Sequence, residues 1–350
     1  MKKIGIITLT GNTNYGNKLQ NYALKTAIEK ITDMKVETIW LDKKTTIKKR
    51  IKGFIKFFIK NKDYRRQQNI KKFNMLLSVK KYKKLDFSNE YSKFVIGSDQ
   101  VWNYNFTPFD YNLFFSLFSS KEKNISYAAS IGVNDIENKY INIFKRGINN
   151  INSISVREDK AKEIIKKISG RKDIEVLVDP TMLLTADDWK TLEKKPKNFN
   201  EKKYILTYFL GNISDERKCE IKKTADKYNC SVINLMDYNS KYYSCGPREF
   251  LWLERNAFLI CTDSFHASVF SILFDKPFLV FKREQNGAEN MMSRIDTLLS
   301  KMKLDSHVFD GKIDEDVLVH NYDNTYKIIE EERKKSFNYL ERTLCMKDGD

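Results

Sequence analysis

The chain has 350 residues, enough for about two domains with buried cores of their own. Its 41% hydrophobic and 13% aromatic content excludes a mainly disordered chain, and 5 Pro with 13 Gly exclude collagen-like and linker-rich classes. The formal net charge is +17, but 17 basic residues against one acidic residue lie within 43–84, which leaves the rest of the chain close to neutral.

The first elements predict a strand, a loop and a helix. The apolar, β-branched run 4–9 is typical of a strand buried on both faces, as in a parallel sheet. The loop 11–17 then leads into a helix predicted for 19–31, and a second strand is predicted for 36–41. Backbone amides at a helix N-terminus bind anions, so Asn14, Gly16 and Asn17 are candidate substrate-binding residues. An ordinary connection between strand and helix is the alternative.

The basic segment 43–84 contains an amphipathic pattern at 47–60, with Ile and Phe on one face and Lys on the other. Such a helix can lie on an anionic membrane surface, or it can pack its apolar face on the N-terminal domain. No nucleic acid partner is expected, because the segment lacks the stacking aromatics on a sheet that single-strand binders use. A further helix is predicted for 64–80.

The rest of the chain alternates strands and helices in two units, which predicts an α/β fold of two Rossmann-like domains. We place these domains at 1–190 and 204–320, joined by a polar linker, and expect a charged helix within 321–350. The first unit has predicted strands at 94–96, 125–129, 153–156 and 175–178, with helices at 136–149 and 158–168. The second has strands at 204–209, 231–235, 258–261 and 277–281, with helices at 214–228, 247–255 and 265–273.

A polar cluster follows the strand 94–96, where open α/β sheets hold ligands. Asp99 could act as a base or bind hydroxyl groups, and Ser98 and Gln100 are candidate binding residues. Trp102 beside these polar groups suits the face of a sugar. The alternative is a helix cap formed by Ser98 or Asp99.

Two further strand ends carry candidate residues. Arg157 could form a fork on a carboxylate or phosphate, although a surface ion pair with Glu158 is the simpler interpretation from these residues alone. His266, one of three His, lies with Ser264 at a strand-to-helix turn and can exchange protons near neutral pH. The alternative for His266 is a role in capping.

Several classes of site are excluded or unsupported by pattern. No GxSxG elbow accompanies Ser264, so a serine hydrolase is excluded, and no HExxH or His/Cys cluster indicates a metal. Five irregularly spaced Cys without a CxxC pair favour reduced thiols in a cytoplasm. The N-terminal apolar run is too short for a signal peptide, and no run reaches the roughly 18 residues of a membrane span.

Six stretches in register together resemble the polysaccharide pyruvyl transferase family. They are 6–9 with 14–24, 95–103, 126–132, 154–158, 178–184 and 262–273. The resemblance implies a fold like that of GT-B glycosyltransferases, with a C-terminal helix that crosses back to the N-terminal domain. One departure is Asn17, which stands where many members carry Gly-Asp after the glycine loop.

The resemblance also implies an activity, namely transfer of pyruvate from phosphoenolpyruvate to two hydroxyls of a sugar in a cell-surface glycan. By motif, Arg157 and His266 fall in the donor site, and Asp99 is the next candidate for the acid. No metal or separate cofactor is required, and a lipid-linked acceptor would bring a cytoplasmic enzyme to the inner face of the membrane. Two alternatives stay open: a glycosyltransferase using a nucleotide sugar, and a non-catalytic protein of the same fold that binds a membrane surface or nucleic acid.

Overall fold

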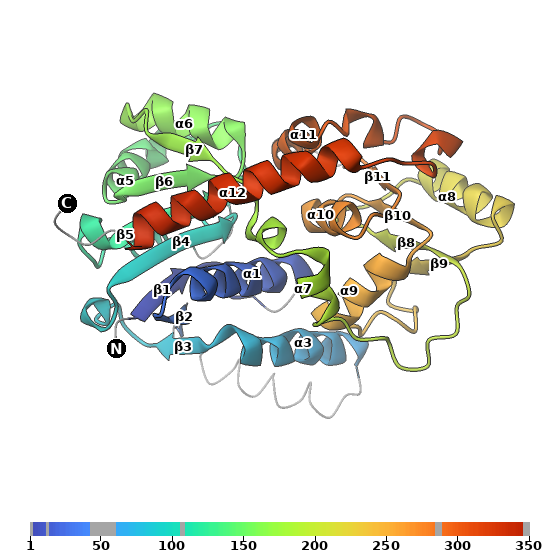
Figure 1. The fold of residues 1–350 in the computed structure, drawn as a ribbon, viewed down its shortest axis with the longest axis horizontal. Helices are drawn as coiled ribbons and strands as arrows, with labels where there is room; N and C mark the ends of the chain where they lie inside the picture. Colours follow the sequence, from blue (N-terminus) through green and yellow to red (C-terminus); the bar gives the residue numbers. More distant parts are fainter. Residues whose placement is uncertain (1–2, 12–13, 43–60, 106–108, 284–288, 346–350) are drawn as a thin grey trace.

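The computed structural model describes residues 3–11, 14–42, 61–105, 109–283 and 289–345. These residues form two α/β domains, each built on a parallel sheet (Figure 1), as predicted from the alternation of strands and helices. The amphipathic helix predicted for 47–60 lies outside the described residues. No helix in the described part of the chain is long and apolar enough to cross a bilayer.

The N-terminal sheet has seven parallel strands in the order β3-β2-β1-β4-β5-β6-β7. Its central strands are buried on both faces, which explains why they read as continuous apolar runs. The strands are β1 (Lys3–Ile7), β2 (Lys35–Leu41), β3 (Val79–Tyr82), β4 (Lys93–Asp99), β5 (Asn124–Ala129), β6 (Ser153–Val156) and β7 (Ile174–Val176). The helices of this part are α1 (Tyr15–Ile31), α3 (Lys62–Lys72), α4 (Tyr111–Phe114), α5 (Asn138–Asn149) and α6 (Asp159–Ser169).

The helix predicted for 64–80 is wrong in its second half. Helix α3 ends at Lys72, a 3-10 turn follows, and Ser78 takes a left-handed backbone conformation with φ 48°. The chain then forms β3, which pairs with β2 at Thr38 and Val79. Pairing at the sheet edge therefore overrides the helical spacing, because strand formation depends on partners that are distant in sequence.

The C-terminal sheet has four parallel strands in the order β11-β10-β8-β9. The strands are β8 (Tyr204–Tyr208), β9 (Ser231–Asn234), β10 (Leu259–Thr262) and β11 (Phe278–Val280). The helices from the connection onward are α7 (Ala186–Lys190), α8 (Asp215–Lys227), α9 (Pro247–Asn256), α10 (Phe265–Leu273), α11 (Glu289–Met302) and α12 (Asp323–Cys345). Helix α10 is buried along its whole length, and the side chain of Ser264 caps it.

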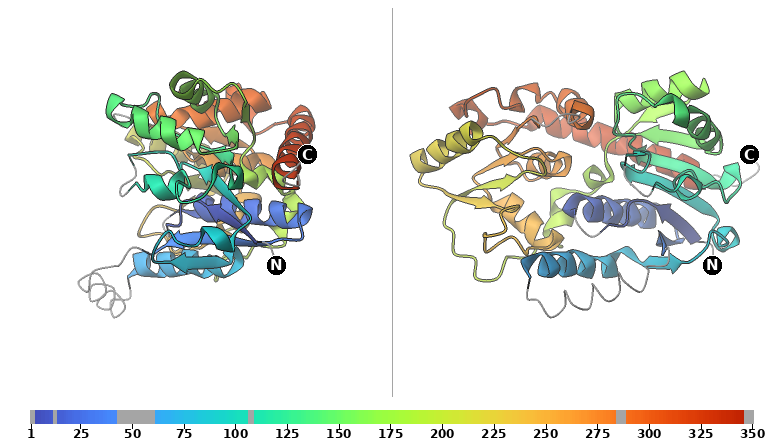
Figure 2. Two further views of the ribbon diagram at one scale, coloured as in Figure 1. Left: turned by 90° about the vertical axis from the view of Figure 1, so that its left-hand side faces the viewer. Right: turned by 180° about the vertical axis from the view of Figure 1, so that it is seen from behind.

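Two helices join the domains along different sides (Figures 1 and 2). Helix α12 begins on the C-terminal domain and ends on the N-terminal domain, where Tyr339 Oη donates to the Ser126 carbonyl at 2.8 Å. Helix α3 contacts the other domain through Arg66, which donates to the Leu235 and Tyr243 carbonyls at 2.8 Å each. These contacts hold the carboxyl ends of the two sheets facing one another.

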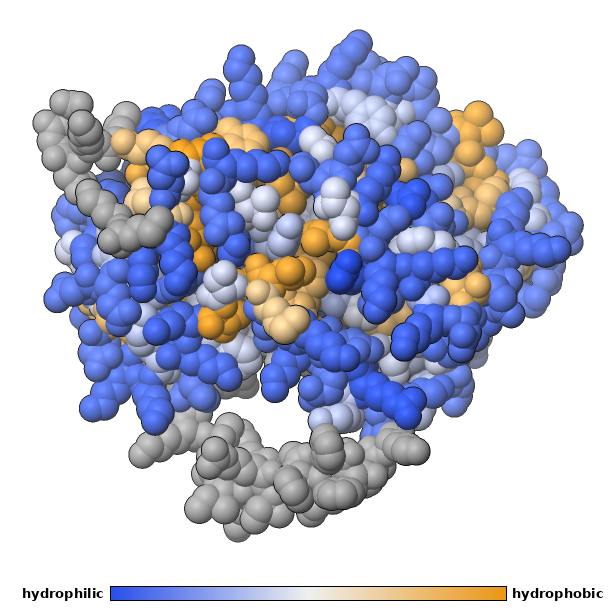
Figure 3. Space-filling view, turned by 60° about the horizontal axis from the view of Figure 1, so that its bottom comes forward, coloured by the Kyte–Doolittle hydropathy of each residue, from blue (hydrophilic) through white to orange (hydrophobic). Residues whose placement is uncertain are grey.

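The surface of the described residues is mainly hydrophilic. Figure 3 shows one face on which apolar residues gather only in separate small areas. Large apolar side chains with high exposure are few among the described residues, and Met75 and Val319 are the most exposed of them. Isolated exposed apolar residues of this kind are normal on a globular protein and do not by themselves indicate an interaction surface.

Candidate active site

Side chains from several strand ends meet around one buried carboxylate, Asp179. Its Oδ2 accepts hydrogen bonds from Ser98 Oγ at 3.1 Å and from Arg157 Nη1 at 2.7 Å. The Nε2 atom of His266, from the other domain, lies 3.7 Å from the same oxygen. Three predicted site residues, Ser98, Arg157 and His266, therefore surround one carboxylate, and that carboxylate was not among the predicted site residues. Asp179 lies after β7, and its second oxygen, Oδ1, accepts a hydrogen bond from Thr181 Oγ1 at 2.7 Å.

Arg157 is held by two carboxylates. Its Nη2 atom also lies 3.4 Å from Asp99 Oδ1, and its guanidinium stacks 4.5 Å from the Phe265 ring centre. Burial alone would lower the pKa of Arg157, but the carboxylates of Asp179 and Asp99 outweigh this effect and raise it. The surface pair with Glu158 is wrong: Arg157 is only 3% exposed, and Glu158 is itself buried.

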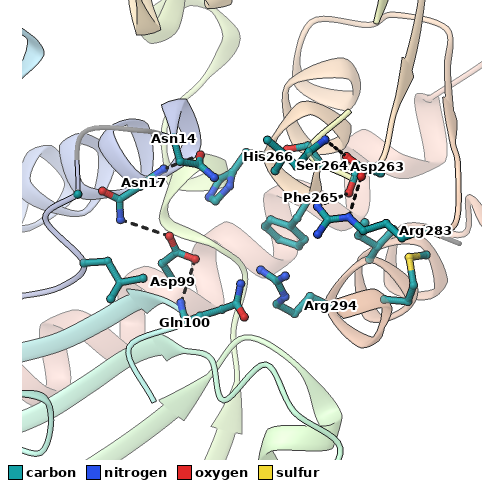
Figure 4. A pocket seen from close by; sticks show the side chains of 15 residues that line it. Asn14, Asn17, Asp99, Gln100, Asp263, Ser264, Phe265, His266, Arg283 and Arg294 are labelled. Atoms are coloured by element: carbon teal, nitrogen blue, oxygen red, sulfur yellow. Dashed lines mark hydrogen bonds and ion pairs between the residues drawn. The ribbon is translucent and has the colours of Figure 1, made fainter. Parts of the chain in front are cut away.

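A cavity of about 250 Å³ lies beside this cluster, between the two domains (Figure 4). It is lined by the N-terminal ends of α1 and α10, the end of β4, one face of α11, and the loops after β1, β8, β10 and β11. Of the predicted residues it receives Asn14, Asn17, Asp99, Gln100, Ser264 and His266. Gly16, Ser98, Trp102 and Arg157 do not line the cavity. Gly16 and Arg157 contact the lining residues His266 and Asp99, and Ser98 donates to the buried Asp179.

Gly16 lets the histidine approach. A Cβ atom at Gly16 would lie 2.1 Å from His266 Nδ1 and 2.8 Å from His266 Cβ. The imidazole therefore packs directly on the backbone of the first turn of α1, across the domain boundary. Gly16 was predicted in a loop, but α1 begins at Tyr15 and Gly16 is helical. The close approach of His266 explains this glycine better than the predicted anion contact does.

The N-terminus of α1 is already capped. The Asn14 Oδ1 atom accepts from the amides of Gly16 at 2.8 Å and Asn17 at 3.4 Å. These two amides are thus occupied by the chain itself, as in an ordinary cap. Asn17 instead donates from Nδ2 to Asp99 Oδ2 at 3.4 Å, which orients that carboxylate in the cavity.

Asp99 is ionised in this site. Burial would raise the pKa of its carboxyl, but the nearby Arg157, His266 and Arg294 outweigh burial and lower it. Its backbone has φ 67°, a strained conformation for a residue other than glycine. Asp99 Oδ1 also accepts from the Gln100 amide at 2.9 Å. A carboxylate held in this way can accept a hydrogen bond from a hydroxyl group.

His266 is mainly neutral near pH 7. Burial lowers the pKa of its imidazole, and Asp179 and Asp99 offset this effect only in part. Its Nε2 atom has no hydrogen-bond partner among the described residues, although the side chain is almost completely buried. A buried imidazole nitrogen without a partner is ready to exchange a proton with a bound molecule.

Trp102 is a core residue, and its predicted role on the face of a sugar is wrong. The side chain is fully buried, stacks on Phe115 at 5.8 Å, and donates from Nε1 to the Phe114 carbonyl at 3.0 Å. Both faces of the ring are thus covered by protein. Its position one turn after the polar cluster reflects packing of the loop on the domain core.

Three charged residues that line the cavity were not predicted from the sequence, namely Asp263, Arg283 and Arg294. Asp263 accepts from the Leu210 and Gly211 amides at 2.6 and 2.7 Å and from Arg283 Nε at 2.7 Å. It thereby ties together three loops of the C-terminal domain. Arg294 reaches the cavity from α11, far from any recognised motif. Asp263 lies directly beside Ser264 in the quoted stretch, so its position after β10 could have indicated it.

The two parallel sheets and the cavity between their carboxyl ends define a two-domain α/β protein of the GT-B type. Its fold is similar to that of UDP-GlcNAc 2-epimerase from Neisseria meningitidis solved with UDP-GlcNAc, with TM-score 0.52, 10% identity, and 99% and 100% of the two chains covered. It is also similar to MnaA from S. aureus solved with UDP, with TM-score 0.51, 12% identity and 100% of each chain covered. At such low identity the likeness concerns the fold alone.

The family model for polysaccharide pyruvyl transferases matches residues 14–285, and the chain belongs to this family. The resemblance found in the sequence is thereby confirmed, and it places the chain among transferases of polysaccharide pyruvylation. A comparison with curated proteins gives no match.

Proposed function

We propose that the protein transfers pyruvate from phosphoenolpyruvate to two hydroxyls of a sugar in a cell-surface glycan, forming a cyclic ketal. The observation that carries this proposal concerns the Nε2 atom of His266, which has no hydrogen-bond partner in the described part of the chain. It is buried at a cavity that also holds guanidinium groups and the N-terminus of α10. Phosphoenolpyruvate carries a carboxylate and a phosphate, and both need cations or oriented amides once water is excluded.

The reaction needs a proton on the donor's methylene carbon. With that proton, C2 becomes cationic and a sugar hydroxyl adds to it; then the C2–O bond to phosphate breaks and the second hydroxyl closes the ketal. One hydroxyl proton balances the proton added to carbon, and the other leaves with inorganic phosphate. His266 is the proposed acid, and it could also stabilise the departing phosphate.

The lowered pKa of His266 does not oppose this role. The anionic donor beside the ring favours the imidazolium, since an opposite charge within a few ångströms raises the pKa of a histidine. Binding of the donor would then be accompanied by uptake of a proton on His266. Asp99, kept ionised, is the proposed acceptor of a hydrogen bond from the incoming sugar hydroxyl.

One observation weighs against the alternative donor, a nucleotide sugar. Open α/β domains bind diphosphates at loop amides after a strand. In this chain the Leu210 and Gly211 amides after β8 are already bonded to the Asp263 carboxylate. A diphosphate there would have to displace a charged side chain that also pairs with Arg283.

The experiment combines binding with turnover. Calorimetric titration should show binding of phosphoenolpyruvate and none of UDP-GlcNAc at equal concentration. Phosphate release with a panel of glycosides and lipid-linked sugars should require His266, and His266→Gln should lower the rate about 10²- to 10⁴-fold while the melting temperature stays near that of the wild type. Binding of the nucleotide sugar alone would refute the proposal. Near-full activity of His266→Gln would remove the acid role from this residue.

A further inference from the structure

We propose that Arg294 is the residue that binds the donor's phosphate monoester group, and that Arg157 is a positioning residue that touches no substrate. This inference rests on the proposed function for the identity of the donor. It differs from the expectation for Arg157, and Arg294 lies in none of the six stretches that carry the family resemblance.

Arg294 has N–H donors that no acceptor among the described residues occupies. Its side chain is 6% exposed, and both terminal nitrogens lie 3.1 Å from the oxygen of the Gln100 amide in the orientation that satisfies both groups. Its Nε atom has no partner among the described residues. A guanidinium has five N–H donors, so most of them remain for a ligand. Leaving a buried donor unpaired is destabilising, and a bound anion removes this penalty.

Among the described residues Arg294 has no direct carboxylate partner, and the more distant Asp99 and Glu158 offset only part of the effect of its burial. No ion pair joins it to a carboxylate in the part of the chain that the structure describes, whereas Arg157 pairs with Asp99 and Asp179, and Arg283 with Asp263. Burial first, and repulsion by Arg157 next, lower the pKa of Arg294 to about 10. It is still charged at neutral pH, so the cavity keeps a cation that attracts a dianion.

A second anion-binding element lies on the same cavity. Helix α10 has 9 residues, and its first-turn amides have no acceptor within the helix. Among the described residues, Ser264 Oγ accepts from the Ala267 amide alone, at 3.5 Å. The amides of Phe265 and His266 thus remain at the positive end of the helix dipole. Figure 4 shows Arg294 reaching from α11 toward the middle of the cavity, between Gln100 and Phe265.

The phosphate is the group that this pair of elements suits. It carries more charge than the carboxylate, and it must leave with the bonding electrons, so stabilisation next to His266 assists the chemical step. The Nε atom of Arg157 also has no partner among the described residues, but both of its terminal nitrogens face carboxylates, Asp179 and Asp99, and Phe265 covers the guanidinium. The geometry of Arg157 suits it to hold Asp99 in place.

The test uses calorimetric titration of the full chain with phosphoenolpyruvate, inorganic phosphate and pyruvate. Arg294→Gln should weaken binding of phosphoenolpyruvate and phosphate about 10- to 100-fold and leave pyruvate binding within about threefold. Arg294→Lys, which keeps the charge, should lose less. Lys301→Gln on the same helix, where Lys301 pairs with Glu332 at 2.9 Å, is the matched control and should bind all three like the wild type.

Arg157→Lys completes the test. As a positioning residue it should lower kcat while the affinity for phosphoenolpyruvate changes by less than about threefold, because Asp99 loses its support but the anion keeps Arg294. Wild-type affinity for phosphate in Arg294→Gln, or a loss confined to pyruvate, would overturn the inference and leave the proposed function intact. Phosphate binding that depends on Arg294, without binding of phosphoenolpyruvate, would support the phosphate site and refute the donor. Absence of phosphate binding in the wild type overturns the inference.

Discussion

Replacement of Gly16 by Ala tests how closely the two domains must approach. The new Cβ atom would lie 2.1 Å from His266 Nδ1, whereas ordinary contact begins at 3.4 Å, so the ring must retreat by about 1.3 Å. Rotation of the imidazole cannot relieve the overlap, because His266 Cβ would itself be only 2.8 Å away. The backbone of α10 must therefore move relative to α1.

The size of the effect follows from two opposing contributions. Alanine in place of glycine favours a helix by about 1 kcal/mol, but overpacking of a close contact costs about 1–3 kcal/mol. A displacement of about 1 Å at a catalytic group can cost roughly 10²-fold in rate. We therefore expect Gly16→Ala to change the free energy of unfolding by no more than about 2 kcal/mol and to lower phosphate release from phosphoenolpyruvate at least about 100-fold.

The measurements are phosphate release with an active acceptor and thermal unfolding. Gly11→Ala is the folding control, since its added methyl group would meet no atom within 4 Å and the melting temperature should stay unchanged. Full activity of Gly16→Ala with an unchanged melting temperature would refute the argument that His266 must pack on this backbone.

Three further outcomes are expected. Asp179→Asn should lower the free energy of unfolding by about 3–5 kcal/mol in urea titrations, because it leaves the guanidinium of Arg157 buried without its nearest counter-charge; a loss below about 1 kcal/mol would contradict this. Because burial lowers the pKa of His266 below 6.5, the unfolded chain binds its proton first, and the free energy of unfolding should decrease as pH falls through that value. The His266→Gln variant should lack this component, and equal pH profiles would count against it. Trp102→Phe should lower the melting temperature through the lost bond to Phe114 and leave the affinity for phosphoenolpyruvate unchanged, whereas weaker binding would restore a role in the site.

Much of the fold could be predicted because its pattern is local. Buried parallel strands read as apolar runs, and helix α10 was predicted at 265–273, the bounds that the structure gives. The strand β3 was missed because it forms by pairing with β2 and carries two lysines among its four residues. Pairing of this kind leaves little trace in a local pattern.

Some residues of the site could likewise be predicted from the sequence, and others could not. Asp99 ends β4 and His266 lies just after β10, so each could be placed at the carboxyl edge of its own sheet. Their approach across the cavity depends on how the two domains face one another, and only the family resemblance implied that arrangement. Trp102 has the same sequence context, but its side chain turns into the core, and only the tertiary structure decides this direction. Arg294 lies four residues before the buried Leu298 on one helix, so a charged residue on an apolar helical face was the available indication.

The path of α12 has a consequence for the order of synthesis. Tyr339 donates to the carbonyl of Ser126, 213 residues earlier in the chain, and its ring lies 6.3 Å from that of Tyr127. At translation rates of about 5–20 residues per second, roughly 10 to 40 s pass between the synthesis of β5 and that of the helix that covers it. During that interval the apolar surface later buried under Tyr339 and Leu340 is exposed to solvent. The nascent N-terminal domain is therefore most prone to aggregate or to bind chaperones before α12 has been synthesised.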